Sequence, residues 1–227
     1  MIFATALVAS LPLLTAAHST PHPQLPRQSN PDPDPQLLPW QVTTLTTHAP
    51  SGRPGNPPYS VLFVNITDPN TIPVPFNGTS MGSPISFPPL SAACVLRWNG
   101  YVSLDTYPEE DPFGRVTDCT VGPAAVNLAT AGRWTVTVGK QNETGYGPSA
   151  TRDFTLTFGL EESMMVEQGI VSVRYEGTGS FAVGENLGLE CGGSGTCNVW
   201  LNETVVEVEQ KLVATTCLSG KCLEEGE

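Results

Sequence analysis

Apolar and polar residues alternate along much of the chain from Trp40 onwards, as they do in half-buried β-strands. In residues 153–160 the large apolar side chains occupy every second position, so one face should be buried and the other wet. Clusters of Gly, Pro, Asn and Asp separate such segments. The pattern predicts strands at 41–46, 59–66, 95–104, 133–138, 153–160, 171–175, 180–183, 199–201 and 204–213.

Helical propensity is confined to residues 161–168, which are too few to supply the crossover helices of a βαβ fold. The glycines at 177 and 179 indicate a turn between two strands, and residues 68–89 form a Pro/Gly/Asn-rich excursion. We therefore expect an all-β fold, a single antiparallel β-sandwich or barrel domain over residues 40–215. An acidic tail containing cysteine follows at 216–227.

The N-terminal residues have the pattern of a signal peptide. An apolar run of about thirteen residues, too short to span a bilayer, leads to Thr15, Ala16 and Ala17, so residues 1–17 are predicted to be cleaved. The recurring prolines of residues 18–39 predict a disordered leader. We expect a secreted, extracellular protein without a membrane anchor.

Six cysteines in an oxidising compartment predict three disulfides, out of fifteen possible connectivities. The sequence does not choose among these, and the preferred set is sequential because a glycine-rich loop separates the middle pair. A zinc site is the alternative, but no histidine lies near the cysteines and their spacing is not that of a zinc knuckle. The preferred pairs are Cys94 with Cys119, Cys191 with Cys197, and Cys217 with Cys222.

Four Asn-X-Thr sequons accompany these cysteines, and none has proline in the middle position. Each is chemically able to accept a glycan in a secreted protein. The candidate glycosylation sites are Asn65, Asn77, Asn142 and Asn202.

The charge balance narrows the range of partners. With 22 acidic and 10 basic residues the formal net charge is −12, which opposes nonspecific binding to nucleic acid or to anionic membranes. His18 and His22 precede the predicted domain, and His48, near its N-terminal end, has the setting of an ordinary exposed residue. A copper site at His18, as in lytic polysaccharide monooxygenases, is not favoured because proline-rich chain follows it. No cofactor is predicted.

Two acidic groups could in principle serve catalysis. The acids at 109–111 and the pair Glu161 and Glu162 are each interpreted as solvated, with calcium binding by Glu109, Glu110 and Asp111 as the next option. A glycosidase needs two carboxyls held across a substrate, and adjacency in sequence does not provide that. No catalytic residue is therefore assigned.

The four tryptophans all lie in or beside predicted strands. Trp98 and Trp134 are expected to fill the core, as tryptophans at strand spacing usually do. Trp40 and Trp200 are kept as candidate residues for stacking on a ligand.

Several local motifs resemble those of a known group of proteins. They are residues 94–98 (Cys-Val-Leu-Arg-Trp), 118–119 followed by 133–136, 153–158, and 181–187 leading to the Cys191 to Cys197 loop. From Trp40 to about Cys222 the chain resembles the small secreted β-proteins of filamentous fungi, and within them the Alternaria major-allergen-like β-barrel family. The resemblance implies a compact disulfide-bonded β fold, secretion, and a role in host interaction or allergenicity. It carries over no functional site.

Together these observations lead us to expect a secreted, N-glycosylated, non-enzymatic extracellular protein, a fungal effector or cell-wall-associated factor. Its expected partner is a host or cell-wall protein or a polysaccharide, and its oligomeric state is not predicted. The alternative is a carbohydrate-binding module that uses exposed tryptophans. A carboxylate-dependent glycosidase is the third hypothesis.

Overall fold

The computed structural model describes residues 37–74, 86–101, 107–122, 130–141, 147–166 and 169–218. Within these ranges the chain forms β-strands and one short 3-10 helix, η1 (Pro108–Glu110). Every pair of named strands is antiparallel. The predicted all-β, antiparallel fold class is confirmed. No helix in this part of the chain is long and apolar enough to cross a membrane.

Most of the early strands belong to a seven-stranded sheet. Its strand order is β11-β12-β1-β2-β5-β7, and β13 pairs with the first residues of β1. The bounds are β1 (Trp40–Ala49), β2 (Tyr59–Asp68), β5 (Leu90–Asn99), β7 (Thr120–Val121), β11 (Leu187–Cys191), β12 (Cys197–Leu201) and β13 (Val206–Val208).

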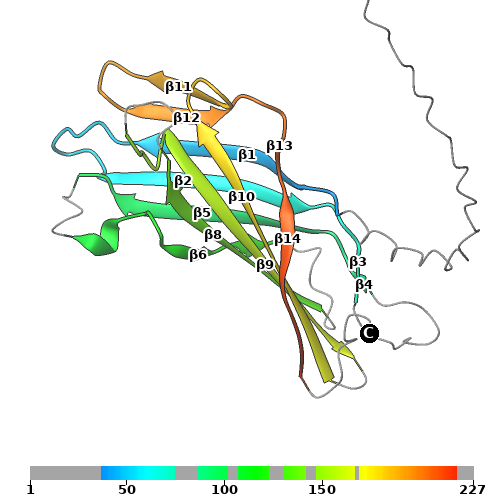
Figure 1. Ribbon diagram of the computed structural model, residues 1–227. Coiled ribbons are helices and arrows are strands. Elements are labelled where there is room, and N and C mark those ends of the chain that lie inside the picture. The colour runs from blue at the N-terminus through cyan, green and yellow to red at the C-terminus, as the bar shows by residue number, and fades with distance from the viewer. Residues whose placement is uncertain are drawn as a thin grey trace, which may run out of the picture. The chain divides into compact units, whose positions relative to one another are not determined.

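The longest strands form a five-stranded sheet of order β14-β10-β9-β8-β6. Figure 1 shows this sheet in front, with its strands crossing those of the seven-stranded sheet obliquely. A separate two-stranded sheet lies within the predicted excursion 68–89. The bounds are β6 (Val116–Asp118), β8 (Thr130–Lys140), β9 (Asp153–Val166), β10 (Gly169–Ala182) and β14 (Gln210–Leu218), with β3 (Ile72–Pro73) and β4 (Ser86–Phe87) in the small sheet.

One hydrophobic core joins the inner faces of the two large sheets. Alternation along each strand produces it: in β9 the buried residues Leu156, Phe158 and Leu160 are separated by less buried ones. At the centre the rings of Trp40 from β1 and Trp134 from β8 meet edge to face, with centroids 4.7 Å apart. Both indoles are fully buried, so this contact ties one sheet to the other.

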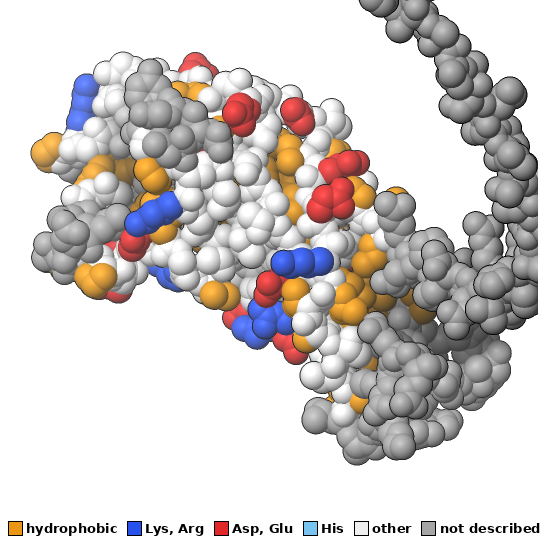
Figure 2. Space-filling model, viewed as in Figure 1, with side chains coloured by type: hydrophobic (Ala, Val, Ile, Leu, Met, Phe, Trp, Pro, Cys, Tyr) orange, Lys and Arg blue, Asp and Glu red, His pale blue; other side chains and the backbone are white. Residues whose placement is uncertain are grey.

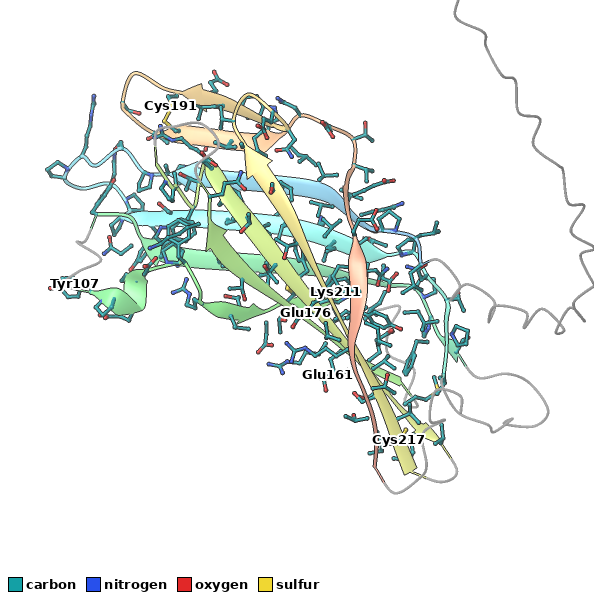
Figure 3. The ribbon with its side chains drawn as sticks, viewed as in Figure 1. Tyr107, Glu161, Glu176, Cys191, Lys211 and Cys217 are labelled. Carbon is teal, nitrogen blue, oxygen red and sulfur yellow. A yellow bond between two sulfur atoms is a disulfide. The ribbon has the colours of Figure 1, made fainter. Side chains whose placement is uncertain are left out.

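Two of the predicted disulfides, Cys94–Cys119 and Cys191–Cys197, are confirmed. The first joins β5 to the residue between β6 and β7, where the chain passes from the five-stranded to the seven-stranded sheet. The second joins directly paired residues of β11 and β12. Cys217 is also disulfide-bonded, and Cys222 lies outside the described residues. Figure 3 shows Cys191 and Cys217 far apart on the ribbon.

Two local predictions are wrong. Residues 161–166, where helical propensity was noted, continue β9 in the same alternating register, with Glu162, Met164 and Val166 on the buried face. The glycines at 177 and 179 do not make a turn, because both lie inside the single strand β10.

Close packing explains why these two strand positions are glycine. A Cβ built on Gly177 would lie 2.5 Å from the backbone oxygen of Glu209 and 3.1 Å from Trp40 Cζ3. A Cβ on Gly179 would lie 3.0 Å from Val208 Cγ2. The strand β13 and the indole of Trp40 therefore press against β10, and glycine here permits close approach and not a change of direction.

The boundaries of the ordered region differ slightly from the predicted ones. β1 begins at Trp40, but Leu38, in the predicted leader, is already held: its N–H donates to Asn70 Oδ1 at 2.9 Å, and Gln210 Nε2 donates to its carbonyl at 2.8 Å. β14 continues to Leu218, beyond the predicted domain end at residue 215. The predicted signal peptide and most of the leader lie outside the described residues.

The two confirmed disulfides should differ in their contribution to stability. Cys94–Cys119 closes a separation of 25 residues and Cys191–Cys197 one of 6. Chain-entropy arguments give about 3.5 kcal/mol for the longer loop and about 2 kcal/mol for the shorter one. We expect the Cys94→Ala/Cys119→Ala protein to lose more free energy of unfolding than the Cys191→Ala/Cys197→Ala protein in urea titrations. The opposite order would show that loop length does not govern the effect.

Candidate functional site

Three of the four tryptophans are unavailable to a ligand. Trp40 and Trp134 have no exposed surface and Trp98 is 6% exposed, as core packing predicts for the latter two. The prediction that Trp40 stacks on a ligand is wrong, because its ring packs between the sheets. Trp200 on β12 is 40% exposed and remains the candidate. The structure therefore provides no row of exposed indoles.

Trp200 lies on the outer face of the seven-stranded sheet. The strand register places it opposite Thr46 on β1, Thr46 opposite Phe63 on β2, and Phe63 opposite Val95 on β5. These residues form a row across four neighbouring strands, and Val95 at the far end is 55% exposed. Since neighbouring strands lie about 4.8 Å apart, Trp200 and Phe63 are separated by roughly 10 Å.

Beside Trp200 the surface is hollowed into a shallow depression of about 310 Å³. Polar groups line it together with the indole: Thr46, His48 and Asn198, with Val61 as an apolar floor. His48 and Asn198 are directly opposed in the β1–β12 pairing, and His48 Nδ1 lies 2.8 Å from Asn198 Oδ1. The hydrogen bond orients the two side chains relative to each other within the lining of the depression.

This depression has the chemistry of a binding surface. An exposed indole offers a flat apolar face, and the amide, imidazole and hydroxyl groups beside it offer donors and acceptors. Its described lining contains no carboxylate and no cysteine. The hydroxyl of Thr47, also in the lining, is engaged because it donates to the carbonyl of Thr151 at 2.7 Å.

The outer face of the five-stranded sheet is different in character. Figure 2 shows this side as mostly uncharged surface, with mixed groups of positive and negative side chains in its lower part and separate acidic side chains at the upper right. Arg133 pairs with Asp118 at 2.7 Å and Arg174 with Glu176 at 2.6 Å. In Figure 3, Glu161, Glu176 and Lys211 follow one another on this side. Such balanced charges indicate a solvated face.

Two of the predicted glycosylation sites fall on the face that carries Trp200. Asn65 lies in the middle of β2 on the outer side, and the exposed Asn202 directly follows β12. Asn77 and Asn142 lie outside the described residues.

Two of the acids at 109–111, Glu110 and Asp111, accept hydrogen bonds from the backbone. Glu110 Oε2 accepts a hydrogen bond from the backbone N–H of Asn99 at 2.6 Å, and Asp111 Oδ1 accepts one from Phe113 N–H at 2.9 Å. The described residues contain no group of three or more His, Cys, Asp or Glu side chains arranged to hold a metal. The carboxylates of Glu110 and Asp111 therefore act as hydrogen-bond acceptors for nearby backbone N–H groups.

Glu162 contradicts its interpretation as a solvated residue. It points inward from β9 and is 4% exposed, while its neighbour Glu161 is exposed. Asp68, at the end of β2, is 2% exposed and interacts electrostatically with Glu162. Asn70 donates to Asp68 Oδ1 from both its backbone N–H and its side-chain amide. Sequence reasoning missed this pair, although the alternation of residues 156–166 could have revealed Glu162.

The buried carboxyls favour their neutral forms. Burial raises the pKa of Glu162 to about 8, and the charge of Asp68 adds to the increase. Burial also raises the pKa of Asp68, while hydrogen bonds from Asn70, and smaller effects of Trp40 and Gln210, lower it in part. Trp40 Nε1 and Glu162 Oε2 have no hydrogen-bond partner of ordinary geometry within the described residues. Near neutral pH this cluster therefore holds a protonated acid in the interior.

The fold and its surface define a disulfide-bonded, all-β domain with one exposed indole beside a polar depression on a sheet face. Comparison with known proteins adds no family to this description. No protein-family model, no curated protein and no solved structure matches the chain. The resemblance to the Alternaria major-allergen-like family stays a prediction.

The raised pKa of Glu162 predicts a stability that falls with rising pH. The unfolded chain releases this proton near pH 4.5 and the folded chain near pH 8. The contribution of protonated Glu162 to the free energy of unfolding is therefore complete below about pH 4.5 and is lost as the pH rises to about 8. Glu162→Gln removes the ionisation, and we expect it to gain on the order of 3 kcal/mol over the native protein at pH 8 and little at pH 4. Urea unfolding at both pH values measures this difference.

Glu161→Gln is the matched control, since it removes the same charge from the exposed neighbouring position. It should leave the pH dependence of stability as it is in the native protein. A Glu162→Gln protein whose stability still falls between pH 4.5 and 8 by the native amount would show that another group is responsible.

Proposed function

We propose that this chain is a secreted, N-glycosylated, disulfide-bonded protein that acts outside the cell by binding and not by catalysis. The observation that carries the proposal is the depression beside Trp200. It is lined by the indole, the His48–Asn198 pair and Thr46, which supply stacking and hydrogen bonds. The lining contains no pair of carboxyls for glycoside hydrolysis.

The compartment is supported by independent features of the chain. Disulfides persist in oxidising environments, and two described pairs tie together strands of this fold. The apolar N-terminal run and the four sequons point the same way. The resemblance to small secreted fungal proteins suggests an effector-like or cell-wall-associated role, with a host or cell-wall molecule as partner.

A carbohydrate-binding function is the second candidate. Sugar rings present flat arrays of C–H groups that pack on aromatic faces, and their hydroxyls pair with amide and imidazole groups. Trp200, Asn198 and His48 provide this combination within one depression. The single exposed indole favours contact with one or two sugar units over a long flat polymer surface.

The glycosidase hypothesis receives less support. Hydrolysis needs two carboxyls on either side of a bound sugar, whereas Asp68 and Glu162 are 2% and 4% exposed and do not line the depression. Their burial agrees better with a role in the stability of the fold.

Incubation of the secreted protein, before and after enzymatic removal of its N-linked glycans, with insoluble chitin, β-glucan and cellulose tests these functions together. Depletion from solution without release of reducing ends is the result expected of a carbohydrate-binding protein, and Trp200→Ala should then lower the bound fraction severalfold. Val95→Ala, an exposed apolar position at the other end of the same row, is the control and should bind normally. Release of reducing ends would overturn the non-enzymatic proposal, and neither effect would favour a protein partner.

A further inference from the structure

An aromatic residue precedes both described sequons at the same spacing. Phe63 stands two residues before Asn65, and Trp200 stands two residues before Asn202. Side chains at positions i and i+2 of a strand point to the same side of the sheet. Phe63 therefore lies on the same face as Asn65 on β2. Asn202 follows the end of β12, and its side chain lies near Trp200 because both approach Gly188.

On β2 the surroundings of Asn65 leave room for a bulky group. Its direct neighbours on the adjoining strands are Thr44 and Ala93, both small. Phe63 is the next outward residue along the strand and is half-buried. Two residues of strand span about 6.7 Å, a distance that an asparagine side chain extended by one sugar ring can cover.

At the end of β12 the two side chains converge above a glycine. A Cβ built on Gly188 would lie 2.5 Å from Asn202 Oδ1 and 2.7 Å from Trp200 Cε2. Gly188 is directly opposite Trp200 in the β11–β12 pairing, so the indole and the amide share the space that a larger residue would occupy. The backbone N–H of Asn202 donates to Asn186 O at 2.9 Å, which holds the backbone of this residue beside the end of β12.

We propose that the first N-acetylglucosamine on Asn65 stacks on Phe63 and that the first one on Asn202 stacks on Trp200, so that the protein's own glycans cover this face. The inference rests on the proposed secretion, because the glycan is transferred from a lipid-linked diphosphate donor in the secretory route. In that step the asparagine Nδ2 forms a bond to the sugar C1 and loses a proton, while the bond from C1 to the diphosphate oxygen breaks. The lipid diphosphate leaves.

In this arrangement the sugar attached to Asn202 occupies the exposed face of the Trp200 indole. The chemistry, a sugar ring on an indole, is the same for an external polysaccharide and for the attached glycan. The attached sugar has the advantage of covalent proximity, which gives it a high effective concentration at the ring. An external sugar then reaches Trp200 only when Asn202 carries no glycan.

Tryptophan fluorescence can detect this coverage directly, because Trp200 is the one exposed indole of four. Acrylamide quenching is measured on the intact glycoprotein, on protein trimmed by an endoglycosidase to a single N-acetylglucosamine per site, and on fully deglycosylated protein. We expect equal protection in the first two and stronger quenching with red-shifted emission in the third. Asn202→Gln should reproduce the third state, and the control Asn65→Gln should not.

A thermal cycle tests the pair on β2, which quenching does not report. The glycan at Asn65 should raise the melting temperature by about 2–4 °C, and Phe63→Leu, which keeps an apolar side chain, should abolish that gain. The four proteins compared are the native glycoprotein, Asn65→Gln, Phe63→Leu and the double variant. Equal effects of Asn65→Gln with and without Phe63 would overturn the stacking at this site.

Mass spectrometry of the two sites separates failure of this inference from failure of the proposed function. Empty sequons at Asn65 and Asn202 would overturn the inference and the proposed N-glycosylation, whereas retention of the protein inside a eukaryotic host would overturn the proposed secretion. Occupied sequons with unchanged quenching and no thermal coupling would overturn the inference alone. Polysaccharide binding by Asn202→Gln but not by the glycoprotein would support it.

Discussion

The packing of Trp40 is the interaction on which the rest of the structure depends. Its indole contacts Trp134 of the opposite sheet and lies against Gly177 of β10. The residue is also the first of β1, the strand that pairs with β2, β12 and β13. The Trp40 side chain therefore contacts both sheets, and it leaves no space for a side chain at position 177 of β10. A buried indole of this size contributes more than any single exposed contact in the fold, since apolar burial scales with area.

The core also contains an acidic side chain whose charged form is destabilised by burial. Glu162 occupies an inward position on β9 where alternation would otherwise place an apolar residue, and Asp68 interacts with it from the end of β2. A protonated acid costs far less to bury than a carboxylate, so this arrangement suits an acidic medium. The sequence pI of about 4.5 agrees with such a medium, because self-repulsion falls as the surface acids become neutral.

Alternation in the sequence was sufficient to predict the fold class and the main strands. The two confirmed disulfides belong to the sequential set that was preferred because a glycine-rich loop separates the middle pair of cysteines. Residues 161–166 were predicted wrongly because local helical propensity was given more weight than the continuing alternation of β9. Gly177 was predicted wrongly because the close approach of Glu209 and Trp40 is not visible in the sequence. The site was less predictable still. Trp40 and Trp200 both adjoin strands, and only the pairing of strands distant in the chain separates the buried indole from the exposed one. The contact of His48 with Asn198 likewise joins residues 150 positions apart.

The two faces of the seven-stranded sheet differ in their surroundings. Its inner face is apolar and shared with the other sheet, while its outer face carries Phe63, Val95 and Trp200 in register. An exposed apolar row on a sheet invites association with other molecules unless something covers it. Because both described sequons lie on this face beside an aromatic ring, attached glycans can shield it without any change in the fold. If the sequons are occupied as we propose, glycan occupancy would determine whether the face is covered or available to a partner.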